Sequence, residues 1–319
     1  MNTKDQLIAL FENNKGEFLS GETIAEKLNI SRTAVWKAVK GLRSDGYKIL
    51  AVPNKGYSLS IQTDIISPQG IAKYLDSSSS IKIIVYPTLT STNTTAREKA
   101  VAGESECVII ANSQTGGKGR NGHTFYSPSD TGLYMSILLR PLGYPAHQAV
   151  KLTTMAAVAV CEAIESISDV KAEIKWVNDI FVGGKKVCGI LTEASIGVEN
   201  GFLEYAVVGI GINLSPPNGG FPSDIKNIAG AIFDEPQSVK NRLAAEVINR
   251  FLSYYKQDKS YVDSYRRRSL VIGKEITVIK PDRQFKAVAL DVDDDCHLTV
   301  RYGDGTTESL SSGEISVKL

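Results

Sequence analysis

The chain has few cysteines and histidines, and neither type is spaced like a metal site or a disulfide framework. The four cysteines lie far apart and form no CxxC pair; they are Cys107, Cys161, Cys188 and Cys296. We expect reduced, mostly buried thiols, as in a cytoplasmic protein. The three histidines lack the spacing of zinc ligands.

Long apolar runs and an excess of charge of one sign are also lacking. The first fourteen residues carry Lys4, Asp5 and Glu12 among apolar residues at helical spacing, which is not the pattern of a signal peptide. The longest apolar run, near residues 155–161, is too short to cross a bilayer. The formal net charge is +1, so any nucleic-acid-binding surface must be a local basic patch.

The first block of the chain has the element order of a winged helix-turn-helix. Residues 4–13 and 20–28 have apolar residues at helical spacing, and Ser31 is a good N-cap for a third helix. Strand-like stretches at 47–52 and 56–59 follow it. In DNA-binding proteins of this order, the second helix of the pair enters the major groove.

Basic residues concentrate on the third helix and the wing of this block. Seven basic residues and one acidic residue, Asp45, lie between Lys27 and Lys55. We expect them to contact phosphates, and the helix start to reach base edges. The predicted DNA-binding residues are Ser31, Arg32, Thr33, Trp36, Lys37, Lys40 and Lys55. The alternative is a winged helix used for protein contacts.

A glycine-rich basic loop follows the predicted strand at 107–113. Three of the four residues 116–119 are glycines, with Lys118 and Arg120 interleaved, so the backbone can approach an anion while the cations face it. Lys118 precedes glycine rather than Ser or Thr, and a strand at 132–140 follows instead of a helix. This excludes a P-loop and a Rossmann motif and predicts a mobile loop between two strands.

Polar residues also interrupt three other apolar segments. Six small polar residues, 90–95, open a helix, where they suit a polar ligand but are also common as caps. Lys175, Asn178 and Asp179 lie in the strand-like segment 172–181, where burial without partners would be costly. The glycines of residues 207–214 would let a ligand lie against the backbone.

The last fifty residues alternate apolar and polar positions and predict a small antiparallel barrel. We interpret the acidic stretch 293–295 as a solvated hairpin turn and the stretches 281–283 and 303–305 as further turns. The predicted strands are 274–279, 285–292, 297–302 and 308–317.

Five motifs in this order resemble those of the bacterial biotin–protein ligases. They are Ser91-Thr92-Asn93, Gln114 with the Gly-Lys-Gly-Arg loop, KWVND at 175–179, Lys186 before CGILTE, and VVGIGINL at 207–214. With the winged helix, the whole chain resembles the bifunctional ligases that also repress the biotin operon. The resemblance implies an α+β multidomain fold. Its parts are a winged helix at 1–62, a mixed-sheet catalytic domain binding biotin and ATP at 63–270, and an SH3-like β-barrel at 271–319.

The resemblance also implies the chemistry. Family members join biotin and ATP into biotinyl-5'-adenylate and transfer biotin to a lysine of the biotin carboxyl carrier protein of acetyl-CoA carboxylase. Bringing a carboxylate to a triphosphate requires positive charge and Mg²⁺. The adenylate is expected to order the glycine loop and to favour a homodimer that binds a two-fold symmetric operator of biotin biosynthesis and transport genes.

Residue roles follow from the same resemblance. Lys186 and Arg120 are the implied catalytic residues, Asp179 is the implied Mg²⁺ ligand together with substrate phosphates, and Trp176 is interpreted as a core aromatic. The implied biotin-binding residues are Ser91, Thr92, Asn93, Gln114, Lys118, Gly119, Arg120 and Lys186. The implied ATP-binding residues are Phe125, Lys175, Asn178, Asp179 and Asn213.

The sequence departs from the family pattern at four positions. Lys118 and His123 stand where Arg is common, Phe125 where Trp is common, and Val177 where Pro is common. Lysine lacks the bidentate fork of arginine, and phenylalanine offers a smaller stacking face. We therefore expect the loop to hold the adenylate less tightly than a Gly-Arg-Gly-Arg loop would.

Two other functions fit part of the pattern. A ligand-sensing repressor without catalysis would not need Lys186, Arg120 and the KWVND segment, and pyrophosphate release distinguishes it. A ligase for lipoate or another acyl group would share the fold, and tests with several acids distinguish it.

Overall fold

The computed structural model describes residues 2–197, 199, 201–257, 260–280, 283–311 and 313–317. The predicted turn at 281–283 therefore lies partly outside the described residues. The chain forms two compact units, residues 1–79 with 237–246, and residues 80–236 with 247–319. Within the described part, no helix has the length and apolar character needed to span a bilayer.

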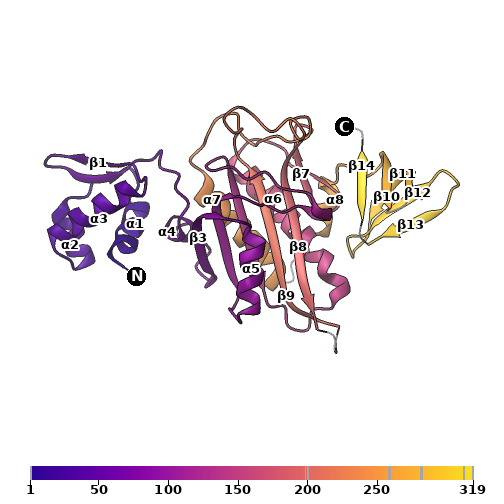
Figure 1. The fold of residues 1–319 in the computed structure, drawn as a ribbon, viewed down its shortest axis with the longest axis horizontal. Coiled ribbons are helices and arrows are strands. Elements are labelled where there is room, and N and C mark those ends of the chain that lie inside the picture. The colour runs from indigo at the N-terminus through magenta and orange to yellow at the C-terminus, as the bar shows by residue number, and fades with distance from the viewer. Residues whose placement is uncertain are drawn as a thin grey trace. The chain divides into compact units, whose positions relative to one another are not determined.

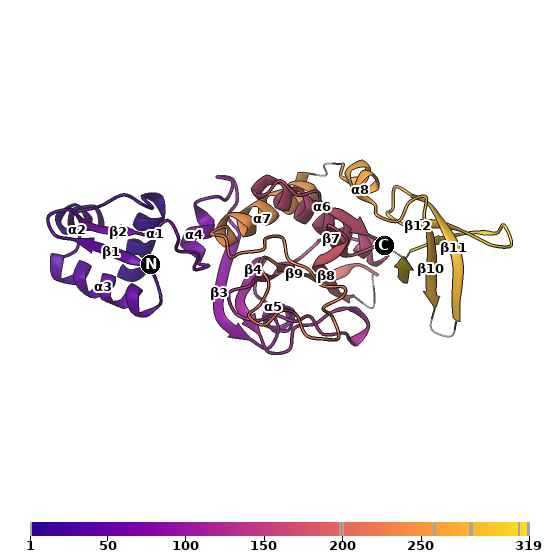
Figure 2. The same ribbon diagram turned by 90° about the horizontal axis from the view of Figure 1, so that it is seen from above.

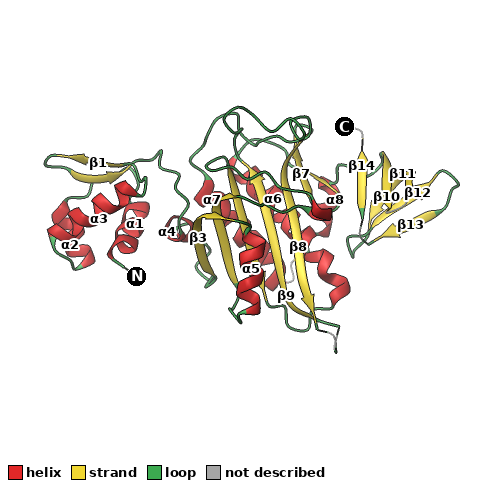
Figure 3. Ribbon diagram, in the orientation of Figure 1, coloured by secondary structure: helices red, strands yellow, loops and turns green. Residues whose placement is uncertain are grey.

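The N-terminal unit contains the predicted helices and hairpin (Figure 3). Its elements are α1 (Thr3–Asn13), α2 (Gly21–Leu28), α3 (Arg32–Ser44), β1 (Ile49–Val52) and β2 (Gly56–Leu59). Ser31 caps α3 by accepting a hydrogen bond from the Ala34 amide at 3.1 Å, as predicted. Asn29 ends α2 in the left-handed conformation, which Asn tolerates better than most residues.

The core of this helix-and-hairpin domain is made by one face of each helix. Leu7, Phe11, Ile24, Val35 and Leu59 are almost completely buried, and each contributes about 1.5–3 kcal/mol of transfer free energy. The face with the predicted DNA-binding residues is therefore presented by a small packed scaffold.

The segment after the hairpin is fastened to the start of a distant helix. This segment contains α4 (Pro68–Ala72), and the distant helix is α7 (Lys240–Gln257). The Asn241 amide accepts from the Ser67 backbone N–H at 3.0 Å and donates to the Ile65 carbonyl at 2.9 Å. Asp64 accepts from the Lys240 backbone N–H at 3.0 Å. These bonds satisfy backbone groups that burial would otherwise leave unpaired.

The second unit is built on a seven-stranded sheet with helices on both faces (Figure 1 and Figure 2). The order is β3-β4-β5-β9-β8-β7-β6, and all neighbours are antiparallel except β3 and β4. The strands are β3 (Lys82–Leu89), β4 (Cys107–Gln114), β5 (Gly132–Leu139), β6 (Glu173–Lys175), β7 (Asp179–Val182), β8 (Lys185–Ile196) and β9 (Leu203–Asn213).

The helices divide the sheet into two different faces. Helix α5 (Thr92–Val101) covers one face, whereas α6 (Ala149–Ile167), with α8 (Val262–Arg268) packed against it, covers the other (Figure 2). The apolar, largely buried α6 seals its face. On the opposite face, the part of the sheet beyond the α5 N-terminus is open for a site.

The predicted strand over 172–181 is wrong, because the segment is a hairpin of β6 and β7. Residues 176–178 form its turn. Asn178 is hydrogen-bonded to Ile190 of β8. Its backbone carbonyl accepts from the Ile190 amide at 3.0 Å, and its side chain donates to the Ile190 carbonyl at 2.9 Å. Trp176 is buried, as expected for a core aromatic, and its indole donates to the Cys296 carbonyl at 3.0 Å.

The C-terminal residues form a five-stranded antiparallel sheet in the order β13-β12-β11-β10-β14. The predicted strand 308–317 is in fact two strands that lie at opposite ends of this sheet. Because β13 pairs with β12 and β14 with β10, no closed barrel forms among the described residues. The strands are β10 (Glu275–Lys280), β11 (Arg283–Val292), β12 (Leu298–Tyr302), β13 (Thr307–Leu310) and β14 (Glu314–Val317).

The acidic turn of this sheet is exposed but also paired with helices of the second unit. Asp294 lies 2.6 Å from Arg266, and Asp295 lies 2.8 Å from Lys151. Such exposed pairs contribute little stability. They show, however, that the predicted solvated turn also has partners in the protein.

Asp64 generates a prediction about the pH dependence of folding. Burial raises its pKa to about 6, although Lys240 opposes the shift. The folded protein thus binds this proton more tightly than the unfolded chain, so the contribution to stability is full below about pH 4 and is lost as the pH rises through about 6. Asp64→Asn keeps an acceptor for the Lys240 amide and removes the charge.

We expect Asp64→Asn to stabilise the protein relative to the wild type by on the order of 1–3 kcal/mol more at about pH 8 than at about pH 4.5. Urea unfolding at both pH values measures this difference. Glu17→Gln, at an exposed position of the same unit, is the control and should show no such difference. An Asp64→Asn effect that is equal at both pH values contradicts the prediction.

Candidate active site

A pocket of about 170 Å³ lies on the open face of the central sheet, above β8 and β9. It brings together residues from α5, the glycine-rich loop, the β6–β7 turn and β8. Every predicted biotin-binding, ATP-binding and catalytic residue lines it except Asn213. The side chain of Asn213 donates to the Gly230 carbonyl at 3.0 Å instead.

One end of the pocket is lined by neutral hydrogen-bonding groups around the start of α5. The Gln114 side-chain oxygen accepts from the Thr92 backbone N–H at 2.8 Å. Asn93 donates to Glu193 at 2.8 Å and to the Leu191 carbonyl at 3.2 Å. Ser91 stands at the N-cap position but makes no capping hydrogen bond, so its hydroxyl is not committed to the helix. These residues were predicted as a group, and the structure brings them together.

Three residues that support this end of the pocket were not predicted from the sequence. Ser136 is fully buried in β5, and its hydroxyl is hydrogen-bonded to the Thr92 hydroxyl and to the Asn93 side-chain oxygen, in each case at 2.7 Å. Ser127 bonds the Gln114 amide at 2.8 Å, and Glu193 accepts from Asn93. A signal for Ser136 was present, because a single serine in the apolar stretch GLYMSILL needs partners when buried.

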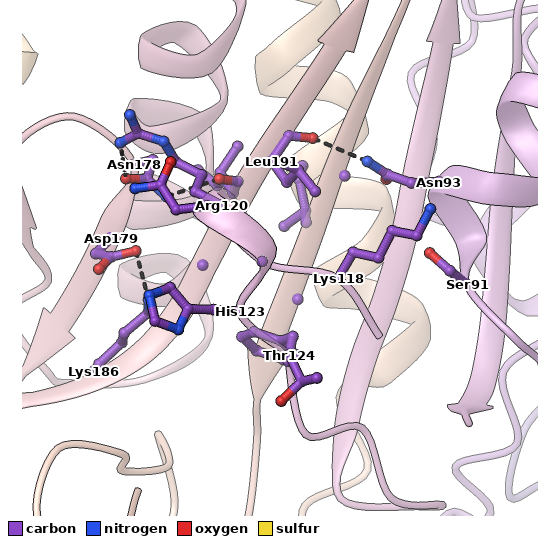
Figure 4. Close-up of a pocket in the computed structure, with 18 of the residues that line it drawn as sticks. Ser91, Asn93, Lys118, Arg120, His123, Thr124, Asn178, Asp179, Lys186 and Leu191 are labelled. Carbon is purple, nitrogen blue, oxygen red and sulfur yellow. Dashed lines mark hydrogen bonds and ion pairs between the residues drawn. The ribbon is translucent and has the colours of Figure 1, made fainter. Parts of the chain in front are cut away.

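The glycine-rich loop forms a strap across the pocket, which we define as residues 115–125. Its two arms pair through the Phe125 N–H and the Gly117 carbonyl at 2.9 Å, and through the Gly119 N–H and the His123 carbonyl at 2.7 Å. A side chain at residue 117 would collide with the Phe125 carbonyl, so the arms can approach this closely only with glycine there. Lys118 extends from the strap toward Ser91 and Asn93 (Figure 4).

The tip of the strap is tied down by Arg120. Its guanidinium donates to the Asn178 side-chain oxygen at 3.0 Å and to the Gly313 carbonyl at 2.8 Å. Arg120 and Asn178 lie together at one side of the site (Figure 4). The strap is therefore linked both to the β6–β7 turn and to the C-terminal sheet.

Lys186 and Asp179 form an ion pair inside the pocket. The ammonium lies 2.7 Å from the Asp179 carboxylate, and the two side chains are 30% and 19% exposed (Figure 4). The backbone of Lys186 is fixed on both sides, by pairing with Phe181 in β7 and by a bridge to Ala229. Because the backbone of Lys186 is fixed, its ammonium can exchange the Asp179 carboxylate for an incoming anion.

Glycines form the floor of the pocket between its two ends. Gly189 of β8 and Gly211 of β9 are directly opposite each other in the sheet. The ring of Phe125 lies on them: a methyl group at Gly211 would be 2.6 Å from Cε1 of this ring, and one at Gly189 would be 3.3 Å from Cε2. Phe125 also packs edge-to-face with Tyr134, whose ring centroid is 6.4 Å away.

Two buried groups near the site are held protonated. Burial raises the pKa of Tyr134 to about 12, and its hydroxyl donates to the Pro128 carbonyl. Burial also raises the pKa of the Cys188 thiol far above its usual range, although Lys186 opposes this. Cys188 is thus not a nucleophile. All four cysteines are free and buried, as predicted.

The N-terminal unit has a separate groove of about 860 Å³ between α3 and the wing. Arg32, Thr33 and Trp36 line it, and all seven predicted DNA-binding residues are exposed. Lys40 stands 5.4 Å from the centre of the Trp36 ring. Asp45, the one acidic residue between Lys27 and Lys55, is paired with Lys4. The α3 face is therefore basic and accessible in this unit.

Comparison with known proteins matches three parts of the chain to family models. Residues 85–213 match the biotin/lipoate A/B protein ligase family, residues 3–58 an HTH domain, and residues 271–318 the biotin protein ligase C-terminal domain. The bifunctional ligase/repressor BirA of Bacillus subtilis is 32% identical over 319 residues, which cover 97% of each chain. The chain belongs to the biotin protein ligase family.

Other family members agree with this placement. The bifunctional ligase/repressor BirA of Escherichia coli is 30% identical over 98% of this chain and 96% of its own. A structure of the biotin protein ligase of Aquifex aeolicus in complex with biotin and ATP superimposes with a TM-score of 0.59. That structure covers 74% of this chain and 97% of its own at 24% identity, so the likeness concerns the fold alone. All residues that line the pocket, except Ile315, fall within the matched stretch 85–213.

Proposed function

We propose that this protein is an ATP-dependent biotin–protein ligase that also acts as a biotin-responsive transcriptional repressor. The observation that carries the proposal is the composition of the pocket in a chain related to bifunctional ligase/repressors along its full length. Neutral hydrogen-bonding groups occupy one end, Lys118 extends toward that end from the strap, and Arg120 and Lys186 lie on the other side (Figure 4). That arrangement suits a ligand with a neutral polar head and an anionic tail.

Biotin fits this division of the pocket. Its ureido ring has one acceptor and two donors, which the Ser91 hydroxyl and the groups around Thr92, Asn93 and Gln114 can match. Because the Ser136 and Glu193 contacts hold Asn93 and Thr92 in place, the network is preorganised before the ligand arrives. The carboxylate of biotin would then point along the floor toward Lys186.

The first reaction joins this carboxylate to ATP. A carboxylate oxygen attacks the α-phosphorus, the bond to the bridging oxygen breaks, and pyrophosphate leaves. Lys186, released from Asp179, neutralises the oxygens that carry negative charge in the transition state, and Lys118 and Arg120 add positive charge from the strap. Removing one such interaction costs on the order of 2.7–4 kcal/mol of barrier.

The nucleotide and its magnesium ion belong at the other end. Lys175, Asn178 and Asn213 are proposed nucleotide-binding residues, and the Phe125 ring can stack on the base. No cluster of three or more His, Cys, Asp or Glu side chains suited to a metal occurs in the described part of the chain. A single carboxylate, Asp179, fits magnesium, which proteins commonly hold by one or two carboxylates together with substrate phosphates. The ion would supply further neutralisation of phosphate charge.

The second reaction transfers biotin to the carrier protein. A deprotonated carrier lysine attacks the acyl carbon, the acyl–phosphate bond breaks, and AMP leaves. We propose the biotin carboxyl carrier protein of acetyl-CoA carboxylase as this substrate, and the cytoplasm, where carrier and ATP occur, as the compartment. The C-terminal sheet is proposed to be an SH3-like fold that supports the strap, because Gly313 accepts from Arg120.

The domain boundaries and the repressor function are proposals of the same kind. We divide the chain into a DNA-binding domain at 1–62, a catalytic domain at 63–270 and a C-terminal domain at 271–319. The exposed basic face of α3 and Lys55 of the wing would contact operator DNA. A homodimer promoted by the adenylate would present two such faces to a two-fold symmetric site.

Intact-mass spectrometry of a carrier domain tests the ligase. We expect the mass of one biotinyl group to be added when protein, biotin, ATP and Mg²⁺ are all present. Lys186→Met should slow this by on the order of 10²–10³-fold. The matched control is Lys185→Met, because this neighbouring lysine is exposed and donates to the Asn227 carbonyl at 2.7 Å, outside the residues that line the pocket. Lipoate and octanoate replace biotin in parallel reactions, and equal modification by those acids contradicts the choice of substrate.

Salt-dependent DNA binding tests the repressor. With biotin and ATP present, we expect binding to a two-fold symmetric operator to weaken in Lys37→Ala and Lys40→Ala, and the slope of log K against log salt to fall by about 0.9 for each lost phosphate contact. Lys286→Ala, in the C-terminal sheet, removes the same charge elsewhere and is the control. Unchanged slopes in the α3 variants contradict the proposed DNA-binding face.

A further inference from the structure

The turn that joins β6 to β7 is held by two buried hydrogen bonds to groups outside the pocket. The hydroxyl of Tyr265 in α8 donates to the Val177 carbonyl at 3.0 Å. The indole of Trp176 donates to the Cys296 carbonyl at 3.0 Å. Neither Tyr265 nor Cys296 lines the pocket. Because Tyr265 and Trp176 are 0% and 3% exposed, water cannot readily replace either bond if it is lost.

Tyr265 is itself fixed by the segment that carries it. Arg268, in the last turn of α8, lies 2.7 Å from Glu165 of α6. Just after the helix, the Leu270 N–H donates to the Ile174 carbonyl of β6 at 2.8 Å. Burial raises the pKa of Tyr265 well above its usual range, so the hydroxyl keeps its proton and can donate. A rigid donor therefore faces the turn.

The turn leads directly into residues proposed to bind the nucleotide and its magnesium ion. Asn178 follows Val177, and its side-chain oxygen accepts from Arg120 at 3.0 Å. Asp179 comes next and lies 2.7 Å from Lys186. Because consecutive residues are joined through a planar peptide of fixed dimensions, a displacement of the Val177 carbonyl also moves the side chains that follow it.

Valine at position 177 increases the importance of support from outside the turn. Proline is common at this position in the ligases that the sequence resembles, and its ring would fix the backbone φ angle. Valine leaves this angle free. The position of the turn in this chain therefore depends on the groups that hold it.

We propose that Tyr265 is a positioning residue for ATP binding in the ligase reaction. This inference rests on the proposed function. Tyr265 fixes the Val177 carbonyl and, through it, Asn178 and Asp179. Without the hydroxyl, a buried carbonyl loses its donor, and the turn occupies the binding-competent position for only part of the time. The apparent affinity for ATP falls in proportion to that fraction.

Steady-state pyrophosphate release by the full chain tests this assignment. Tyr265→Phe removes one oxygen and keeps the ring. We expect the KM for ATP to rise about tenfold, whereas the KM for biotin should stay within about twofold, because the biotin end of the pocket is built on α5 and β5 instead. Tyr254→Phe is the matched control. It removes a tyrosine hydroxyl that donates to Glu162 at 2.8 Å, and it should leave both KM values within about twofold.

Fluorescence of Trp176 reports on the turn without any substrate. The chain has two tryptophans, and Trp36 is 53% exposed, so Trp36→Phe leaves the buried Trp176 as the single emitter. In that background we expect Tyr265→Phe to increase acrylamide quenching of Trp176 at least about twofold, because the turn opens more often. Tyr254→Phe should leave the quenching unchanged. Circular dichroism verifies that each variant is folded.

Three results overturn the proposal. An unchanged KM for ATP, or unchanged quenching, in folded Tyr265→Phe would show that the hydroxyl does not position the turn. An equal rise in both KM values would indicate a general loss of packing. If Tyr265→Phe does not fold, Trp176→Phe removes the other buried bond of the same turn and must give the same selective rise in the KM for ATP. Failure of the proposed function is seen separately, as absence of pyrophosphate release by the wild type, and leaves the quenching comparison valid.

Discussion

Glycines let backbone segments of the strap and the sheet approach closely, and this close approach sets the geometry of the site. The strap closes only because Gly117 brings its two arms together, and the floor can hold a flat group only because Gly189 and Gly211 stand opposite each other. A side chain at Gly117 or Gly211 would collide with Phe125. The positions of Lys118 and Arg120 depend on this spacing, because both residues belong to the strap.

Two cations of the site are paired with protein groups that a bound ligand can replace. Lys186 faces Asp179, and Arg120 donates to Asn178 and Gly313. A buried or half-buried charge without a partner is costly, so these partners stabilise the two cations. In the proposed mechanism, anionic substrates would exchange one partner for another at little cost in desolvation. The same exchange would free Asp179 for a magnesium ion.

The sequence correctly predicted the elements whose conformation is set by interactions between neighbouring residues. Ser31 imposes a local conformation as an N-cap, and the glycine-rich segment is a loop between two strands; both of these predictions are confirmed. The segment 172–181 was predicted as one strand because its apolar residues continue on both sides of the turn. Its actual turn is set by the distant pairing of Asn178 with Ile190, which no local pattern reveals.

The candidate site was predictable as a set but not in its detail. The predicted site residues line one pocket, apart from Asn213. The Asn213 side chain donates to the carbonyl of Gly230, a residue that lies outside the motifs. Glu193 was missed because its role depends on a partner 100 residues away, Asn93. The two C-terminal strands were joined in the prediction because the alternating pattern of 308–317 continues through the turn between them.

A crystal structure of the protein with a non-hydrolysable biotinyl-adenylate analogue tests the central claim most directly. The account predicts that the analogue lies along Gly189 and Gly211 beneath the strap, with its ureido ring at Asn93 and the Lys186 ammonium within hydrogen-bond distance of the acyl–phosphoryl oxygens. An analogue bound elsewhere, or one that leaves Lys186 remote from the phosphoryl group, would contradict it.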